Sequence, residues 1–182
     1  MELGIPMVLA LNMMDEVEKN GGTIRVNELE AELGIPVVPI SAAKNQGVDE
    51  LVDHALHVAR FYELPEQIDF CPSSEEEHNP LGAVHRCIHA TAHLIEPYAE
   101  QAYVPLRFAA TKMVEGDELI KEKLSLPESA LSSIDELITS MEKDAGMDSE
   151  AALANMRFSF LSDLCSKTVV RPHESREHKL SL

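Results

Sequence analysis

Two short polar segments each follow an apolar run, and their residue types suit recognition of a planar base. Asn12-Met13-Met14-Asp15 follows the apolar residues 5–11, and Ser41-Ala42-Ala43 follows the run 35–40. A carboxylate such as Asp15 accepts two adjacent hydrogen bonds from the N1–H and exocyclic amine of guanine, a donor pair that adenine lacks. Because an unpaired buried acceptor is costly, such a carboxylate discriminates between the two bases. The pattern indicates a guanine site.

The other residues of the two segments have supporting roles in this interpretation. Ser41, Ala42 and Ala43 are small, so the backbone can approach a ligand closely, and the Ala42 N–H can donate to guanine O6. The Asn12 amide is expected to tie its loop to the neighbouring one. A simpler interpretation is a strand-ending turn with a helix cap, followed by an ordinary loop. The occurrence of both segments in one unit favours the base site.

The surrounding apolar patterns predict the elements that bring these loops together. Residues 5–11 and 35–40 are short continuous apolar runs, typical of buried parallel strands. Between them, apolar residues at helical spacing predict a helix that ends at Gly34. Leu51, Val52, Ala55, Leu56 and Ala59 mark a second amphipathic helix. Because parallel strands joined by a crossover end at the same edge, the loops should be neighbours.

The rest of the chain is predicted to be helical. Residues 65–77 contain prolines, serines and an acidic run, and are interpreted as a linker between domains 1–64 and 78–170. Apolar stripes predict helices over 81–98, 105–115, 117–124, 129–143 and from 148 or 149 to about 169. Residues 171–182 are polar and are interpreted as a flexible tail.

Three histidines recur every fourth residue along the first of these helices. His85, His89 and His93 fall opposite the apolar stripe, so they are expected to face solvent. Imidazoles at positions i and i+4 can chelate a divalent metal ion. Surface histidines are nevertheless commoner than metal sites, so no metal site is predicted, and this stripe is the only candidate.

Composition excludes several classes of function. The formal net charge of −17 argues against binding nucleic acid or anionic lipid surfaces. The three cysteines lie far apart without a CxxC pair, which predicts a reducing, cytoplasmic environment and no disulfide framework. No signal peptide pattern and no apolar run long enough to span a membrane is found in the sequence.

The two loops resemble the NKxD and SAK motifs of the Ras-like GTPases. Longer segments, covering 4–18, 34–44, 107–117 and 169–178, are similar to the ferrous iron transport protein B family. The resemblance extends over essentially the whole chain. In that family, a cytosolic GTPase domain is followed by a helical domain that slows GDP release and then by a membrane permease for ferrous iron.

The resemblance implies a fold and a site. Residues 1–64 would contain the last two parallel strands and helices of a Ras-like P-loop GTPase sheet (α/β), and 78–170 an all-α helical bundle. The guanine of GTP or GDP would contact Asn12, Met13, Asp15, Ser41, Ala42 and Ala43. Met13 stands where many GTPases have a base-stacking lysine, so its stacking on the base would be apolar.

The phosphate-binding motif Gly-x-x-x-x-Gly-Lys-Ser/Thr does not occur in this sequence. We therefore expect a fragment holding only the C-terminal half of a GTPase domain, with Mg²⁺ bound through parts outside the chain and no hydrolysis by the chain alone. Its partners would be the missing N-terminal half and the permease, at the cytosolic face of a bacterial inner membrane. The alternative is a helical binding or divalent-metal-buffering module without a nucleotide role.

Overall fold

The computed structural model describes residues 1–65 and 80–171, which group into two compact units. Of the described residues, the first unit contains Met1, 3–65 and 162–171, and the second contains Glu2 and 80–161. Among the described residues, no helix is both long and apolar enough to cross a membrane. The fold is mostly helical with little sheet, as the sequence predicts.

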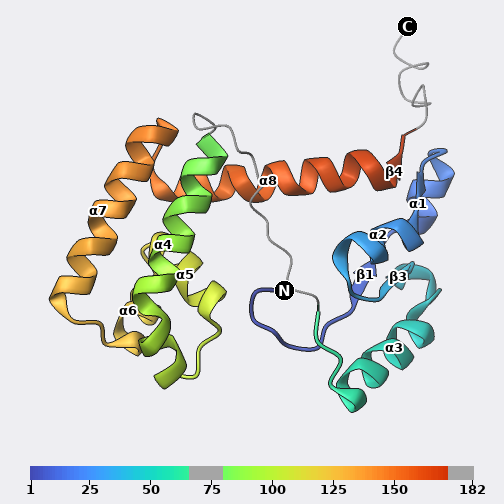
Figure 1. The fold of residues 1–182 in the computed structure, drawn as a ribbon. Coiled ribbons are helices and arrows are strands. Elements are labelled where there is room, and N and C mark those ends of the chain that lie inside the picture. Colours follow the sequence, from blue (N-terminus) through green and yellow to red (C-terminus); the bar gives the residue numbers. More distant parts are fainter. Residues whose placement is uncertain (66–79, 172–182) are drawn as a thin grey trace, which may run out of the picture. The chain divides into compact units, whose positions relative to one another are not determined.

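A parallel strand pair lies at the centre of the first unit. Strand β1 (Leu9–Leu11) pairs with β3 (Val37–Pro39), and Leu9 lies opposite Val37. Helix α2 (Val26–Leu33) lies between them in sequence, and α3 (Val48–Phe61) follows β3 (Figure 1). Helix α2 ends where Gly34 takes a left-handed conformation with φ 60°. The predicted strand–helix–strand–helix order and the parallel pairing are confirmed.

The strands are shorter and less buried than the apolar runs predict. Only three residues of the run 5–11 form β1, and they are partly exposed, whereas Val37 and Val38 in β3 are buried. Pro6 and Pro36 have no N–H for a ladder, which contributes to the short pairing. The expectation of two fully buried strands is therefore wrong for β1.

The burial expected for α3 is also wrong. The helix is present, but only Val58 is buried, while Val52, Ala55 and Ala59 are exposed and Leu56 is 63% exposed. The apolar stripe correctly predicts the helix because periodicity is a local property. Burial depends on what covers the face, and no described element covers this one.

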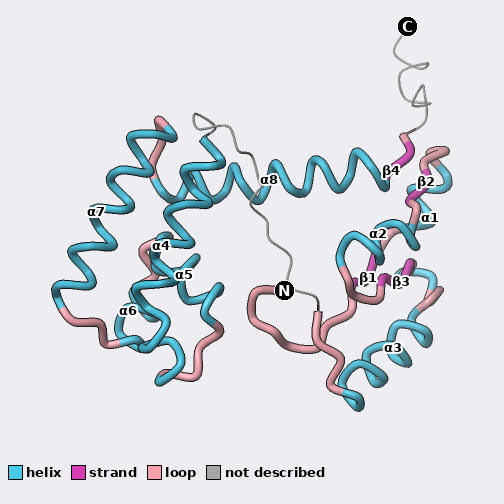
Figure 2. The backbone as a smooth tube through the Cα atoms, in the orientation of Figure 1, coloured by secondary structure: helices cyan, strands magenta, loops and turns pink. Residues whose placement is uncertain are grey.

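Four short elements have no prediction from the sequence. They are α1 (Met14–Lys19), β2 (Thr23–Ile24), the 3₁₀ helix η1 (Ala42–Lys44) and β4 (Val169–Val170). Strand β2 pairs antiparallel with β4, as the magenta segments in Figure 2 show. The Arg25 N–H continues this contact by donating to the Thr168 carbonyl at 2.8 Å. The end of the chain's last described helix is therefore anchored in the first unit.

The second unit is a helical bundle with one apolar core. It consists of α4 (Pro80–Gln101), α5 (Leu106–Val114), α6 (Glu118–Leu124), α7 (Glu128–Ala145) and the first part of α8 (Ser149–Thr168). All five correspond to predicted helices. The core is formed mainly by buried residues of four of these helices: Val84, Cys87, Ile88, Ile95, Ala109, Ala110, Met113, Ile134, Met141, Leu153 and Met156.

The predicted domain limits remain a prediction. The second unit contains α8 only up to Leu161, and the rest of this helix groups with the first unit. The sequence pattern assigns all of α8 to the helical region 78–170, because a continuous helix gives no local signal of such a division. Apart from residues 65 and 171, the predicted linker 65–77 and tail 171–182 lie outside the described residues.

Candidate functional site

Asn12 connects the two loops that follow β1 and β3. Its Oδ1 accepts hydrogen bonds from the N–H of Met13 at 2.8 Å and from the N–H of Ala42 at 3.1 Å. The Met14 N–H also donates to the Ile40 carbonyl at 3.1 Å. These bonds hold the loops side by side at the carboxyl ends of the parallel strands, where ligands bind in open α/β sheets. The structure thus brings the two predicted segments together.

Asp15 lies in the first turn of α1, and its carboxylate faces the second loop. Its Oδ2 is 2.8 Å from Lys44 Nζ, and the Asp15 side chain is only 16% exposed. The Lys44 ammonium is the main cause that lowers the pKa of Asp15 below its ordinary range, and the neighbouring Ser41 hydroxyl lowers it further. Asp15 is therefore an ionised acceptor at neutral pH, which is the form that a donor pair on a base requires.

Ser41 fixes the second loop through its backbone. Its N–H and carbonyl exchange hydrogen bonds of 3.0 and 3.1 Å with Gln46, which closes a tight loop around η1. The residue is 3% exposed, and its Oγ has no hydrogen-bond partner of regular geometry among the described residues. We therefore attribute its effect on the pKa of Asp15 to the hydroxyl dipole nearby. A buried hydroxyl beside the carboxylate is consistent with a polar site.

Met13 and Ala43 complete the predicted set at the surface. Met13 has a left-handed backbone with φ 65°, and its side chain is 61% exposed. Ala43 is an exposed residue of η1. An exposed apolar side chain two positions before Asp15 is available for contact with the face of a ring, and the stacking of Met13 on a base stays a prediction.

Sequence reasoning assigned no role to Lys44, although in the structure its ammonium contacts the Asp15 carboxylate. Its ammonium is one of the two charges that meet between the loops. The tripeptide Ala42-Ala43-Lys44 is a single turn of η1, so the lysine follows closely on the Ala42 N–H. One signal could have found Lys44. Loops that follow adjacent parallel strands lie close together, so every residue of the second loop, Lys44 included, was a candidate neighbour of Asp15.

The histidine stripe faces solvent as predicted at His89 and His93, whereas His85 is partly buried. His89 is exposed, but its Nε2 lies 3.2 Å from Nη1 of Arg107, and its ring stacks against His85 at a centroid distance of 4.2 Å. A guanidinium on the imidazole nitrogen disfavours a cation there. In the described part of the chain, no group of three or more potential metal ligands is found.

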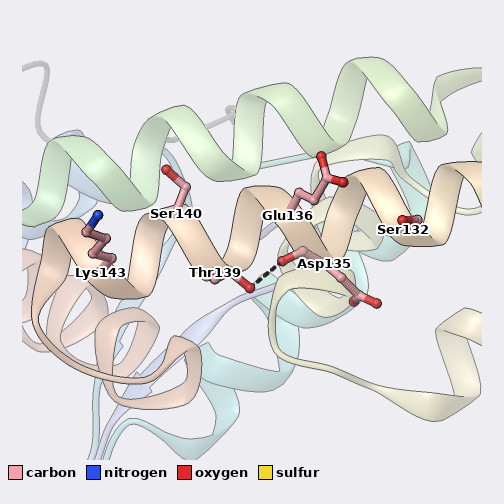
Figure 3. A pocket seen from close by; sticks show the side chains of 6 residues that line it. All are labelled: Ser132, Asp135, Glu136, Thr139, Ser140 and Lys143. Carbon is pink, nitrogen blue, oxygen red and sulfur yellow. Dashed lines mark hydrogen bonds between the residues drawn. The ribbon is translucent and has the colours of Figure 1, made fainter.

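A shallow hollow on α7 is a second surface feature. It is lined by Ser132, Asp135, Glu136, Thr139, Ser140 and Lys143, all from one helix (Figure 3). The Thr139 hydroxyl is already engaged, because it donates to the Asp135 carbonyl at 2.8 Å. Side chains from one helix face do not converge on a ligand. This hollow is therefore not a candidate site.

Family comparisons assign both parts of the chain to one kind of protein. A family model described as ferrous iron transport protein B matches residues 1–55, and another, described as the FeoB cytosolic helical domain, matches residues 82–170. The chain belongs to the ferrous iron transport protein B family. The family predicted from the sequence motifs is therefore confirmed.

Curated relatives carry the same family name. The chain is 32% identical over 180 residues to an Fe(2+) transport protein A/Fe(2+) transporter FeoB fusion protein of Porphyromonas gingivalis, covering 92% of the chain and 20% of the relative. It is 29% identical to an Fe(2+) transporter FeoB of Legionella pneumophila, covering 97% of the chain and 21% of the relative. The chain thus spans about a fifth of the length of these relatives.

Solved structures share the fold. A GDP-bound mutant of the S. thermophilus FeoB G-domain superposes with a TM-score of 0.75 and 28% identity, covering 93% of this chain and 61% of that one. NFeoB from S. thermophilus bound to mGMPPNP gives a TM-score of 0.70 and 28% identity, covering 96% and 60%. Both relatives were solved with guanine nucleotides or an analogue.

One part of the sequence interpretation is wrong. The prediction of a mere C-terminal half of a GTPase domain, lacking its phosphate loop, is contradicted by the family model on residues 1–55 and by the likeness to NFeoB structures. That prediction rested on a missing motif. A missing local pattern is weaker evidence than a match along a whole segment. We therefore assign residues 1–55 to the family whose model they match.

Proposed function

We propose that this chain contributes guanine-base recognition to a GTP-regulated ferrous iron transporter. The observation that carries the proposal is the arrangement of the two loops. The Asn12 side chain links them by accepting a 3.1 Å hydrogen bond from the Ala42 N–H, and the Asp15 carboxylate faces the second loop at Lys44. GDP-bound relatives of the same fold support a guanine nucleotide as the ligand.

The chemistry of the residues fits a guanine. The ionised Asp15 offers two oxygens to the N1–H and the exocyclic amine, and the Ala42 N–H offers a donor to O6. Met13 offers an apolar surface to the face of the ring, and Ser41 and Ala43 leave room for the base. A polar pair that matches the base edge discriminates strongly, because a base with the wrong donors leaves buried groups unpaired.

The cellular role proposed here follows the family. Relatives named Fe(2+) transporter FeoB support participation in ferrous iron transport, and the model described as a cytosolic helical domain supports a position on the cytosolic side of a bacterial inner membrane. The helical unit would influence nucleotide release by favouring one arrangement of the guanine loops over another. Membrane passage of iron would depend on parts of the parent protein beyond this chain.

The decisive experiment compares nucleotides and one substitution at Asp15. Dissociation constants for GDP, ADP and XDP would be measured by NMR titration of the full chain, a method that also detects weak binding. The wild-type protein should prefer GDP. Asp15→Asn should reduce that preference about tenfold or more, because the amide donates where guanine also donates. The variant should in turn favour XDP, whose base has a carbonyl in place of the amine.

Glu16→Gln is the matched control, since it removes an equal charge from the adjacent position. Glu16 is an exposed residue whose carboxylate lies 3.6 Å from Lys19 Nζ. Its substitution should leave the preference for GDP unchanged. Equal binding of GDP and ADP by the wild-type protein, or an unchanged preference in Asp15→Asn, would contradict the proposed function.

A further inference from the structure

Both groups proposed to contact the guanine edge already have partners within the chain. Asp15 Oδ2 is 2.8 Å from Lys44 Nζ, and the Ala42 N–H donates to Asn12 Oδ1 at 3.1 Å. An ammonium supplies the kind of donor that guanine N1–H and its amine supply. An amide oxygen supplies the kind of acceptor that guanine O6 supplies. The two loops thus satisfy these groups with the same hydrogen-bonding pattern that the base would bring.

The two arrangements compete for the same atoms. A guanine bound in the plane of the carboxylate places one hydrogen bond on each oxygen of Asp15, whereas Lys44 holds Oδ2. Lys44 is 57% exposed, so its side chain is free to swing toward water when its partner is taken. The Asp15 carboxylate is the main cause that raises the pKa of Lys44, and the acidic Glu16 and Glu18 raise it further.

Resting on the proposed function, we propose that Lys44 is an internal competitor of guanine that sets nucleotide affinity and release. Its ammonium contacts the Asp15 carboxylate, and guanine displaces it on binding. Return of Lys44 to Asp15 then favours release of the base. The pair is partly exposed, and exposed ion pairs change an equilibrium constant by about two- to fivefold. The effect expected from this competition is of that size.

The test uses two substitutions of Lys44 with opposite expected effects. Lys44→Met removes the competitor, so GDP should bind about two- to fivefold more tightly and dissociate more slowly. Lys44→Arg keeps the charge and adds a planar fork suited to a carboxylate, so GDP should bind more weakly than to the wild-type protein. The advantage of Lys44→Met should shrink as salt is added, because salt weakens the competing ion pair.

Lys19→Met is the matched control, because it removes the same charge from α1 while Lys19 pairs with Glu16 at the surface. It should leave GDP affinity unchanged. A direct measurement follows the NMR chemical shift of the Asp15 carboxyl carbon against pH, without added nucleotide. The pKa of Asp15 should rise in Lys44→Met and stay low in Lys19→Met. This measurement needs no nucleotide, so it tests the contact by itself.

The outcomes separate the two proposals. If GDP binding depends on Asp15 but both Lys44 variants bind GDP more weakly, or both bind it equally to the wild type, the competition is refuted and base recognition stands. Weaker binding by Lys44→Met alone would mean that Lys44 supports the bound base, which also refutes competition. If GDP binding does not depend on Asp15, the proposed function fails and this inference fails with it.

Discussion

Gly47 allows the second loop to turn back into α3. Its backbone has φ +72°, a left-handed conformation that side-chain-bearing residues rarely adopt. A Cβ at this position would lie 2.4 Å from the Pro39 carbonyl oxygen and 3.2 Å from a methyl of Ile40. The loop that contains Ser41 and Ala42 is therefore closed by a residue that has no room for a side chain.

We expect Gly47→Ala to destabilise the first unit by about 2–4 kcal/mol, from backbone strain and from displacement of the Pro39 carbonyl. Chemical denaturation followed by circular dichroism would measure this. Gly4→Ala is the control in the same unit, because Gly4 also has a positive φ but open space around its Cβ position. A cost for Gly47→Ala no larger than that for Gly4→Ala would show that close packing at this turn is unimportant.

Sequence reasoning at this scale identified residues by their own chemistry and missed their partners. Asn12 and Asp15 could be proposed from the sequence because a second polar segment follows the neighbouring strand, which favours a base site over a simple turn with a cap. The Asp15–Lys44 pair was not, because it depends on a rotamer of a long side chain that joins two loops. The sequence predicts that Asn12 ties its loop to the neighbouring one, but only the structure shows that the donor of this bond is the Ala42 N–H.

Two helices of the second unit begin at an aspartate that accepts a hydrogen bond from a first-turn N–H, and a third ends at a glycine. Asp117 Oδ1 accepts from the Ile120 N–H at 3.2 Å at the start of α6, and Asp148 Oδ1 accepts from the Ala151 N–H at 2.8 Å at the start of α8. Helix α7 ends at Gly146, which has φ 70°. These caps define the start of α6, the start of α8 and the end of α7, since the first and last turns of a helix otherwise leave backbone groups unpaired.

Removal of the α6 cap tests this interpretation. Asp117→Ala should lower the free energy of unfolding by about 1 kcal/mol, because the Ile120 N–H loses its acceptor. Asp117→Asn should retain most of the stability, since asparagine caps helices about as well while lacking the charge that faces Lys112 at 3.6 Å. Urea denaturation of both variants would decide. Equal losses in the two would assign the effect to the ion pair.

How well an element could be predicted depended on its length. The long helices were predicted because their apolar spacing repeats over several turns. Strands β2 and β4 have two residues each and pair across most of the chain, so no local pattern marks them. Helix α1 was missed because its six residues are mostly polar. The exposed side of α3 was mispredicted because an apolar stripe does not specify whether a neighbour covers it.

Charge is the dominant property at the scale of the whole molecule. The chain has 32 acidic and 15 basic side chains, so there are too few basic side chains to pair with most of the carboxylates. In the second unit, two of these basic residues converge on one carboxylate: Lys112 lies 2.7 Å from Glu115, and Arg157 of α8 also contacts it. This cluster links α5 to α8 within the bundle. Its strength should therefore appear in the stability of the whole unit.

The Glu115 cluster predicts a specific dependence of stability on pH. Burial raises the pKa of Glu115, but hydrogen bonds from Lys112 and Arg157 outweigh burial and lower it below the ordinary 4.5. A lowered folded pKa adds stability that is complete above the ordinary value and is lost as pH falls through the folded value. Glu115→Gln should therefore cost roughly 1 kcal/mol at pH 7, and the cost should vanish in acid. Urea denaturation between pH 7 and pH 3 measures it, with the exposed Glu136→Gln as control. A cost for Glu115→Gln that is constant across this range would indicate lost packing instead of lost charge pairing.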